Sequence, residues 1–560
     1  MRKKHLKRIV ALGCSSLMVG GTVFGVTACK PKVSDTPETL EIFIAELGYG
    51  AAWCEAMTQA FAQEDWVKAK YPNLNIILEV DGDRSVINTR LEAGEGYNTV
   101  DLVMSDSITA MGQDKSGVEY SCDLTDVVYK TTVPGESGTV YDKLLDPYKK
   151  SLQWYGYGDS ALETQDFKSY DFNWATGMQG IVYNEELLEE CGFDAPPRTS
   201  DEWIEQMDVI TAKKGYSIMW SSEANYLHYL FNIWWGQYEG YNNYYNYYNG
   251  LYFDGEFYIE KSNKVFEQKG RYEALDAMSK IMHVKQGGYM YEYGGSVKFK
   301  AAQKNFINGE ASVFMANGDY MSDENAADTA ASNYTIRMMK TPIISAITDT
   351  TETIKDDATL RTVVSRIDDG YATVDAAKKA PTKEGDADIS NVSEDDYKKI
   401  IAARAITDSV GSSHHTCIPV YAAGKQVAFD FLRFMATDKA QEIYMKATKG
   451  ATLPFKYDIN AFKEREPEIY NSFYDMQKDR LSYAYASVEG QNLLPATSTF
   501  PLVKYGGLSR FTTYGLDSGS ILSFPMSGKD AYQAWLRDIE YWQADNGQRW
   551  QDVIRKAGLN

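Results

Sequence analysis

Between residues 38 and 104, short apolar runs alternate with amphipathic stretches. Leu40–Ile44 is compact and apolar, as expected of a buried strand. A glycine turn at 48–50 separates it from a stretch with Trp53, Met57 and Phe61 on one helical face. The same order recurs as a strand over 75–80, a helix over 85–93 and a strand over 100–104. Strands that alternate with helices form a parallel sheet covered by those helices, so the pattern predicts an α/β fold.

The glycine turn has part of the spacing of a nucleotide-binding loop, because Gly48-x-Gly50-x-x-Trp53 follows a strand and precedes a helix. Dinucleotide-binding loops have a third glycine at the last of these positions, where it lets the helix and the sheet approach closely. Trp53 would block that approach. We therefore interpret the segment as a turn whose side chains face the end of the sheet, and we expect no cofactor.

The first 29 residues have the organisation of an export signal. Five basic residues and no acid precede an apolar stretch over 9–28, which ends in Val26, Thr27 and Ala28 before Cys29. This ending resembles the lipobox of bacterial lipoproteins. The resemblance implies that residues 1–28 are a signal peptide, that Cys29 carries diacylglycerol, and that residues 29–37 include a linker. Acyl chains would then hold the protein on the outer face of a bacterial cell membrane, as in Gram-positive cells.

The charge of the chain argues against nucleic acid as a partner. The chain has 57 basic and 78 acidic residues and a formal net charge of −21, and loss of residues 1–28 with their five basic side chains makes it −26. Binding to a phosphate backbone requires a clustered basic face, which this acidic chain does not offer. No second apolar run of about 18 residues follows the signal segment, so we expect no membrane-spanning helix in the mature chain.

The spacing of cysteine and histidine argues against a metal or redox site. The cysteines after position 29 are Cys54, Cys122, Cys191 and Cys417, and none has CxxC spacing. An exported protein can form one or two disulfides, but a chain this long is stabilised by its cores, and we expect buried free thiols. His414 and His415 are adjacent on a predicted strand, so their side chains point to opposite faces and do not converge on one ion. HExxH, GxSxG and GxxxxGKS/T motifs are absent from the sequence.

A specific motif pattern lies between residues 173 and 207. Tyr183-Asn184 precedes an acidic helix, Cys191-Gly192-Phe193, and then Pro196-Pro197-Arg198-Thr199-Ser200-Asp201-Glu202-Trp203. Thr199 or Ser200 is suited to cap the following helix, with Glu202 as the capping-box acid. The pattern resembles that of family 1 extracellular solute-binding proteins, the group that includes maltose-binding protein. Segments 306–320, 411–437 and 450–454 and a terminal helix over 529–542 resemble the family as well.

This resemblance implies a two-lobed, class II periplasmic-binding-protein-like fold with discontinuous lobes, a hinge and an interlobe cleft. Lobe one would contain residues 38–125 and 316–410, and lobe two residues 126–315 and 411–560. The polar stretch 343–409 is longer than the family's connection and is interpreted as an insertion within lobe one, with a helix capped at Ser393.

The loops that follow the first and third strands are candidate ligand contacts, because ligands of open α/β sheets bind at the carboxyl ends of strands. Glu46, Tyr49 and Trp53 follow the first strand, and Asp106 follows the strand over 100–104. The two carboxylates are suited to accept hydrogen bonds from sugar hydroxyls. The alternative is that they cap helices or stay solvated.

Residues 220–248 are the most aromatic part of the chain. Sugars expose apolar C–H faces and hydroxyls, so flat aromatic side chains with polar rims suit them. By position relative to the family's motifs, Tyr226 and Tyr229 fall among cleft aromatics; alternatively, Tyr226, Leu230, Ile233 and Trp234 form one buried helical stripe. The same comparison adds three further candidates, Trp174, Asp319 and Tyr320.

The resemblance implies a monomeric, non-enzymatic receptor that binds a carbohydrate, an oligosaccharide in our interpretation, and delivers it to the permease of an ABC transporter. A lipid-anchored glycoside hydrolase is an alternative, and it would need two carboxylates at a set separation. A peptide or amino-acid receptor is another, and it would need an arginine for the ligand carboxylate. The aromatic content of 13%, with 41 tyrosines, favours sugar.

Overall fold

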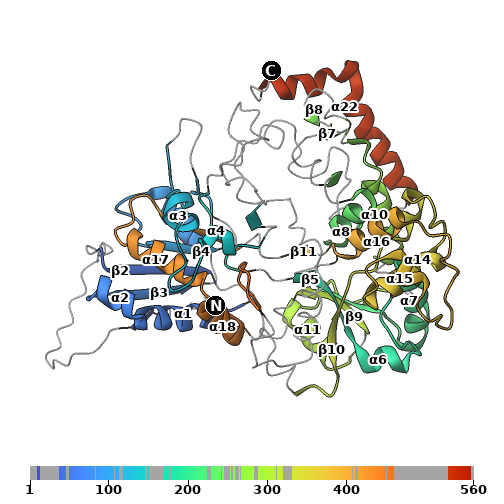
Figure 1. Ribbon diagram of the computed structural model, residues 1–560, viewed down its shortest axis with the longest axis horizontal. Helices are drawn as coiled ribbons and strands as arrows, with labels where there is room; N and C mark the ends of the chain where they lie inside the picture. Colours follow the sequence, from blue (N-terminus) through green and yellow to red (C-terminus); the bar gives the residue numbers. More distant parts are fainter. Residues whose placement is uncertain are drawn as a thin grey trace.

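The protein is mixed α/β, with two main sheets in two lobes, as seen in a computed structural model (Figure 1). The α/β prediction is therefore confirmed. The structure describes residues 9–12, 37–45, 49–81, 84–105, 108–112, 118–145, 148–149, 169–175, 178–222, 227, 229–240, 243–244, 252–253, 257–258, 264, 266–282, 288–310, 312–318, 331–406, 408–409, 414–448, 451–458 and 528–556.

The first lobe is a five-stranded sheet with helices on both faces. Its strands, in spatial order, are β1 (Ile9–Leu12), β3 (Asn75–Asp81), β2 (Thr39–Ala45), β4 (Leu102–Ser105) and β12 (His415–Cys417). As predicted, β2 is parallel to β3 and β4, whereas β1 and β12 are antiparallel to their neighbours. The helices are α1 (Ala52–Gln63), α2 (Asp65–Lys70), α3 (Arg84–Ala93), the π-helical turn η1 (Thr125–Tyr129), α4 (Val140–Lys143), α17 (Lys425–Met435) and α18 (Asp438–Ala447).

Both faces of β2 are buried, which explains its continuous apolar sequence. Leu40 and Ile42 belong to a hydrophobic cluster shared with α1, α17 and α18. Phe43 belongs to a second cluster, on the opposite face, with Ile87 and Leu91 of α3. Figure 1 shows α1 and α3 on opposite sides of β2 and β3.

The second lobe is built on a sheet in which β5 is central. The strands are β10 (Ile336–Met339), β5 (Met178–Asn184), β9 (Phe314–Gly318) and β6 (Ile218–Met219) in that order, with β11 (Asp408–Ser409) also paired to β5. β10, β9 and β11 are antiparallel to β5, and β6 is parallel to β9. A separate hairpin consists of β7 (Tyr252–Phe253) and β8 (Phe257–Tyr258).

Helices cover both faces of this second sheet as well. They are α6 (Glu185–Glu190), α7 (Ser200–Lys214), α8 (Tyr229–Glu239), α10 (Gly270–Ile281), α11 (Phe299–Ile307), the 3-10 helix η5 (Ser345–Thr350), α14 (Asp357–Asp368), α15 (Val374–Lys378), α16 (Glu394–Arg404) and α22 (Gly528–Lys556). α11 packs on one face with Val182 and Met315, and α7, α8 and α10 pack on the other with Ile181 and Phe314.

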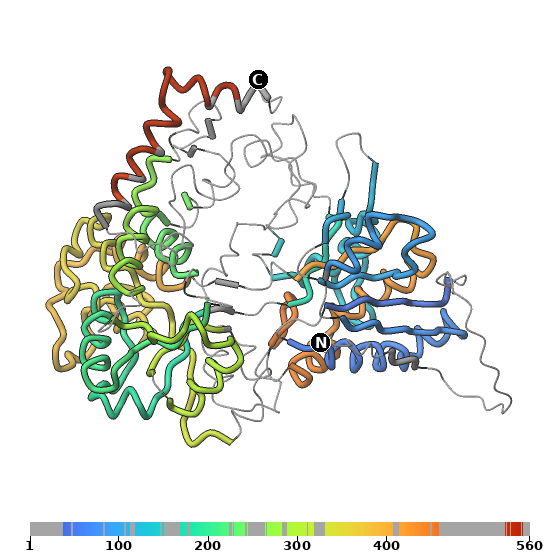
Figure 2. Tube along the Cα trace, turned by 180° about the vertical axis from the view of Figure 1, so that it is seen from behind, coloured from blue at the N-terminus to red at the C-terminus, as the bar shows by residue number. Residues whose placement is uncertain are grey.

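The lobe boundaries expected from the sequence are wrong in three places. Within 316–410, β10 pairs with β5 and α14 and α16 share the core of α8, so the described residues 331–406 belong to the second lobe. Residues 414–458 belong to the first lobe, because β12 pairs with β4 and α17 and α18 pack with α1. Residues 126–145 and 169–175 contribute Val128 and Phe172 to the same first-lobe core. In Figure 2 the orange segment with α17 and α18 lies with the blue strands of the first lobe, and the yellow helices lie in the second lobe.

The chain passes from the first lobe to the second between Ala175 and Met178, and returns between Ser409 and His414. The first residues of β5 pair with β11, with Asp408 opposite Gln179, so both crossings leave the same end of the second sheet. We call this the interlobe end. Because β9 is antiparallel to β5 and parallel to β6, the carboxyl ends of β9 and β6 also lie there. Met445 of α18 packs against the hydrophobic cluster that contains Phe306 of α11, so the lobes are also in contact.

Two predicted helix caps are present. Thr199 accepts a hydrogen bond from the backbone N–H of Glu202 at 3.2 Å, and Ser393 accepts one from Asp396 at 3.1 Å. The carboxylate of Glu202 accepts from the N–H of Arg198 at 2.6 Å, one residue before the position a capping box predicts. The predicted terminal helix over 529–542 is present as the first part of α22, and non-helical backbone at 544–547 separates it from the helical residues that follow.

Candidate ligand-binding site

Three aromatic residues expected to contact ligand meet in the first lobe. Trp53, in the first turn of α1, stacks on Trp174 with ring centroids 5.0 Å apart and 24° between the planes. Tyr49 meets Trp174 at 6.5 Å in an edge-on arrangement. Gly50 lies between Tyr49 and α1 at φ +64°, a left-handed conformation that glycine adopts without strain. The glycine turn after β2 therefore leads directly into this aromatic cluster.

These rings are part of the first-lobe core. Trp53 and Trp174 are 0% exposed and Tyr49 is 2% exposed. His414 lies edge-on to Trp174 at 4.5 Å, and Tyr444 lies edge-on to Trp53 at 5.0 Å. Among the described residues, the indole N–H of Trp53 has no hydrogen-bond partner. A role for Tyr49, Trp53 and Trp174 as sugar contacts stays a prediction.

One side chain ties the two crossing segments together on the first-lobe side. Asp171 bonds Nδ1 of His415 at 2.7 Å and accepts from the backbone N–H of Thr416 at 2.9 Å. The indole N–H of Trp174 adds a bond to the carbonyl of His415 at 3.2 Å. Burial lowers the pKa of His415, but the charge and hydrogen bond of Asp171 outweigh it and raise that pKa above its usual value. The segments before Ala175 and after His414 are thus joined where they leave the lobe.

Trp220 occupies a position that the sequence did not single out as a ligand contact. It follows β6 directly and so lies at the interlobe end of the second sheet, where ligands of α/β sheets bind. Its ring is half-buried, and its indole N–H donates to the carbonyl of Tyr291 at 2.7 Å. A Cβ on Gly294 would lie 2.2 Å from the ring, so glycine is required for this approach. Its position directly after a strand could have marked Trp220 as a ligand contact. However, β6 has only two residues and is too short to predict from the sequence.

Tyr229 is the first residue of α8 and is partly exposed. The residues that follow on this helix, Leu230, Ile233 and Trp234, are 3%, 1% and 0% exposed and belong to the second-lobe core. Their burial confirms the alternative interpretation for these three residues, whereas Tyr229 lies at the edge of the core. Its predicted role is neither supported nor contradicted by this placement.

The other predicted positions lie outside the described residues. They are Glu46, Asp106, Tyr226, Asp319, Tyr320 and the lipidation site Cys29. The strands that precede Glu46 and Asp106 end at Ala45 and Ser105, one residue later than predicted, and β9 ends at Gly318, directly before Asp319.

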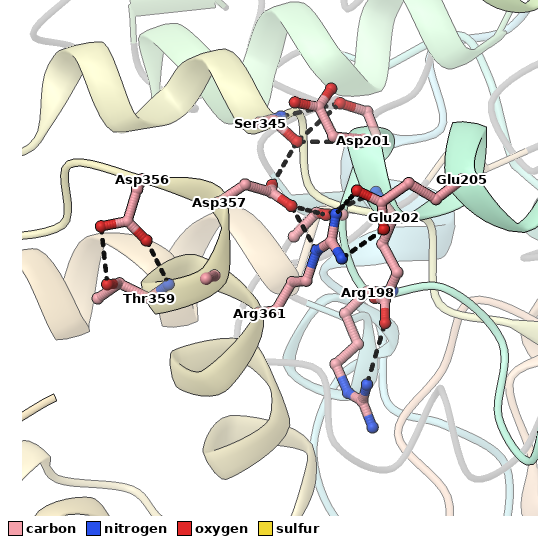
Figure 3. A network of polar contacts seen from close by, with 12 residues as sticks. Arg198, Asp201, Glu202, Glu205, Ser345, Asp356, Asp357, Thr359 and Arg361 are labelled. Carbon is pink, nitrogen blue, oxygen red and sulfur yellow. Dashed lines mark hydrogen bonds and ion pairs between the residues drawn. The ribbon is translucent and has the colours of Figure 1, made fainter. Parts of the chain in front are cut away.

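A polar network joins the 343–409 segment to α7 (Figure 3). Arg361 of α14 makes a bidentate pair with Glu205 at 2.7 and 2.8 Å and also bonds Asp357. Asp357 accepts from Ser345 at 2.6 Å and from Thr199 at 3.1 Å. The cap of α7 is therefore fixed by the helix that follows η5.

Next to this network is a cavity of about 250 Å³ with acidic walls. Its lining includes Asp201, Glu273, Asp276 and Asp357. Glu273 pairs with Lys269 at 2.7 Å and Asp276 with Lys280 at 2.8 Å, so much of the charge is neutralised. Within the described ranges, no group of three or more histidine, cysteine, aspartate or glutamate residues is arranged to hold a metal ion. The network and cavity are explained by the attachment of the 343–409 segment to the lobe.

The histidine and cysteine side chains follow the expected geometry. His414 faces Tyr49 and Trp174, whereas His415 faces Asp171, so the adjacent imidazoles do point apart. Cys54, Cys191 and Cys417 are buried free thiols, as predicted, and Cys122 is partly exposed.

A family model described as bacterial extracellular solute-binding protein matches residues 51–442 of the 560. No curated protein sequence matches the chain. Solved structures with a similar fold include a family 1 extracellular solute-binding protein from Bifidobacterium longum subsp. infantis, with 13% identity, a TM-score of 0.44, and 92% of this chain and 99% of that chain covered. The GacH receptor of Streptomyces glaucescens, solved unliganded and with acarbose, has 13% identity, a TM-score of 0.49, and coverage of 92% and 98%. A chitin oligosaccharide binding protein has 12% identity, a TM-score of 0.48, and coverage of 92% and 99%.

The matched region spans more than half of the chain and includes the crossings and most of both lobes. The chain therefore belongs to the bacterial extracellular solute-binding protein family, as its motifs around Asn184 predicted. This is a family of binding proteins. In the part of the chain that the structure describes, no helix is long and apolar enough to cross a bilayer.

Proposed function

We propose that the protein captures an oligosaccharide outside the cell membrane and delivers it to the permease of an ABC transporter, without catalysing a reaction. The observation that carries this proposal is the family match over residues 51–442. The fold agrees with it, because two chain segments connect the two lobes and are hydrogen-bonded to each other at both ends. Trp220, a half-buried aromatic side chain at the interlobe end of the second sheet, supports a sugar as the ligand.

A ligand screen by thermal melting tests the substrate class. A ligand present at 100 times its Kd stabilises the folded protein by about 2.7 kcal/mol, which is readily seen as a raised melting temperature. We expect a rise with an oligosaccharide and none with amino acids or peptides. A rise with peptides alone would contradict the proposal, and release of reducing ends from a bound oligosaccharide would identify a hydrolase.

Ligand binding should close the two lobes about the crossings. The ligand contacts both lobes only when they approach, so its binding free energy favours the closed arrangement. Small-angle scattering should show a smaller radius of gyration when the identified sugar is saturating. An unchanged radius would contradict a closure mechanism.

We further propose that Cys29 anchors a monomer to the outer face of the membrane after removal of residues 1–28. The support is the small-residue sequence before Cys29 and the polar stretch after it. Replacement of Cys29 by alanine should move the processed protein from the membrane fraction to the soluble fraction. Retention of a processed Cys29→Ala protein in the membrane would refute the lipid anchor.

A further inference from the structure

A cluster of tyrosines lies beside β6 at the interlobe end of the second sheet. Met290 pairs with Ile218 in a parallel bridge, and the backbone N–H of Tyr291 donates to the carbonyl of Ile218 at 2.9 Å. The chain at 290 therefore runs in the same direction as β6. Residues 291–293 follow this bridge in the same way that Trp220 follows β6. They therefore also lie at the interlobe end of the second sheet.

One exposed carboxylate, that of Glu292, lies beside the cluster. The ring of Tyr291 contacts Tyr216 at 5.2 Å and Tyr293 at 5.5 Å, with interplanar angles of 87° and 70°. The nearby hydroxyls of Tyr216 and Tyr293 lower the pKa of Glu292. The carboxylate is consequently ionised at neutral pH and acts as an acceptor. Tyr293 is 57% exposed, so much of its surface is open to solvent.

The backbone that carries the cluster is fixed. The indole N–H of Trp220 bonds the carbonyl of Tyr291, and Ser222 bonds the carbonyls of Gly294 and Gly295 at 3.1 and 2.9 Å. Tyr291 also packs against the hydrophobic cluster beneath α11. A surface held in this way loses little conformational entropy when a ligand binds to it.

The chemistry of the cluster suits a sugar ring. An exposed phenol ring offers an apolar face to pyranose C–H groups. A carboxylate has about four lone-pair directions, so Glu292 can accept from sugar hydroxyls while Tyr216 and Tyr293 lie beside it. A single carboxylate among neutral phenols is a poor site for a metal ion, which needs several oxygen ligands.

We propose that Tyr293 and Glu292, supported by Tyr216 and Tyr291, form an outer saccharide subsite that binds a ring beyond those held inside the receptor. This inference rests on the proposed function, because it assigns a length preference to the same carbohydrate ligand. The receptor consequently binds longer oligosaccharides more tightly than short ones.

The test uses the full-length protein and titrations with purified oligosaccharides. The probes are raffinose and homologous series of α-linked glucose, β-linked glucose and β-linked N-acetylglucosamine, from disaccharides to hexasaccharides. We expect affinity of the wild-type protein to increase with length in the series that binds. Tyr293→Ala and Glu292→Gln should each weaken the longest members by about tenfold and leave the shortest bound member unchanged. Tyr293→Phe, which keeps the ring, should have a smaller effect than Tyr293→Ala.

Tyr97→Ala is the matched control, since Tyr97 is a 69% exposed tyrosine of the first lobe. It should alter affinity for no member of the series, and melting curves should show that all variants are folded. The outer subsite is refuted if sugar affinity does not depend on oligosaccharide length, or if the Tyr293 and Glu292 variants leave that affinity unchanged. Either result would leave the proposed function intact. Failure of the wild-type protein to bind any saccharide, with binding of peptides or amino acids, overturns the proposed function and this inference with it.

Discussion

Trp174 offers the sharpest distinction between a core residue and a ligand contact. It is 0% exposed, stacks on Trp53 at 5.0 Å, and donates its indole N–H to the carbonyl of His415. Replacing a fully buried large aromatic residue by alanine costs about 3 to 5 kcal/mol, from lost burial and the cavity that remains. This is a large part of the 5 to 15 kcal/mol that typically stabilises a folded domain. Trp174→Ala should therefore strongly lower the melting temperature of the empty protein.

Calorimetry is the appropriate measurement, because two lobes with separate cores need not unfold in one step. Trp174→Phe keeps an aromatic ring against Trp53 and removes the bond to His415, so it should cost only about 1 kcal/mol from that bond, plus some packing. Trp535→Ala, at a half-buried position on α22 in the other lobe, controls for the loss of an indole that has no proposed contact with ligand. If Trp174→Ala melts like the wild-type protein but no longer binds sugar, the ring is a ligand contact and our interpretation of the core is wrong.

Three further changes test other contacts. Asp171→Asn removes the charge that raises the pKa of His415, so the pKa of His415, measured by NMR titration, should fall; an unchanged pKa would contradict the pairing. In the wild-type protein the raised pKa means that the stabilisation by this pair is complete below about pH 6.5 and is lost as the pH rises through the folded-state value, which denaturant titrations across that range should detect. Gly424→Ala would place a Cβ 2.0 Å from the carbonyl of Thr39, so we expect a loss of more than about 3 kcal/mol or no folded protein, and a normal melting temperature would refute the close approach. Arg404→Met removes a buried partner of an ion pair within the 343–409 segment and should cost about 3 kcal/mol by chemical denaturation; no loss would show that the pair contributes nothing.

Local patterns predicted the first lobe well up to β4. The runs that became β2 and β3 and the amphipathic stretch of α1 are each specified within a few residues, and the structure begins and ends them close to the expected positions. The same holds for the caps at Thr199 and Ser393, where one side chain decides where the helix begins. Such features depend on neighbours in sequence, which is why the sequence was sufficient.

Assignment of segments to lobes required information that no local pattern contains. β12 consists of the three residues His415–Cys417, where a strand was expected, but nothing local indicates which sheet it joins. Its pairing with Ser105 and Val103 of β4 places it in the first lobe. The 343–409 segment looked like a polar insertion because the exposed faces of its helices dominate its composition. Its apolar residues, such as Val363 and Ile400, complete the second-lobe core. Ligand contacts were harder still, because aromatic residues suit both a core and a sugar, and only burial separates the two.

The late position of β12 also has a consequence for the order in which the protein folds. The second lobe draws most of its core from one stretch, residues 178 to 406, and can begin to pack as soon as that stretch is available. The first lobe must wait, because β4 pairs with β12 about three hundred residues later and α17 and α18 come later still. Pairings over such distances form slowly, since the closure of a long loop precedes any gain from contacts. A chain that emerges from its amino end would therefore keep its first hundred residues incompletely packed until the rest has followed.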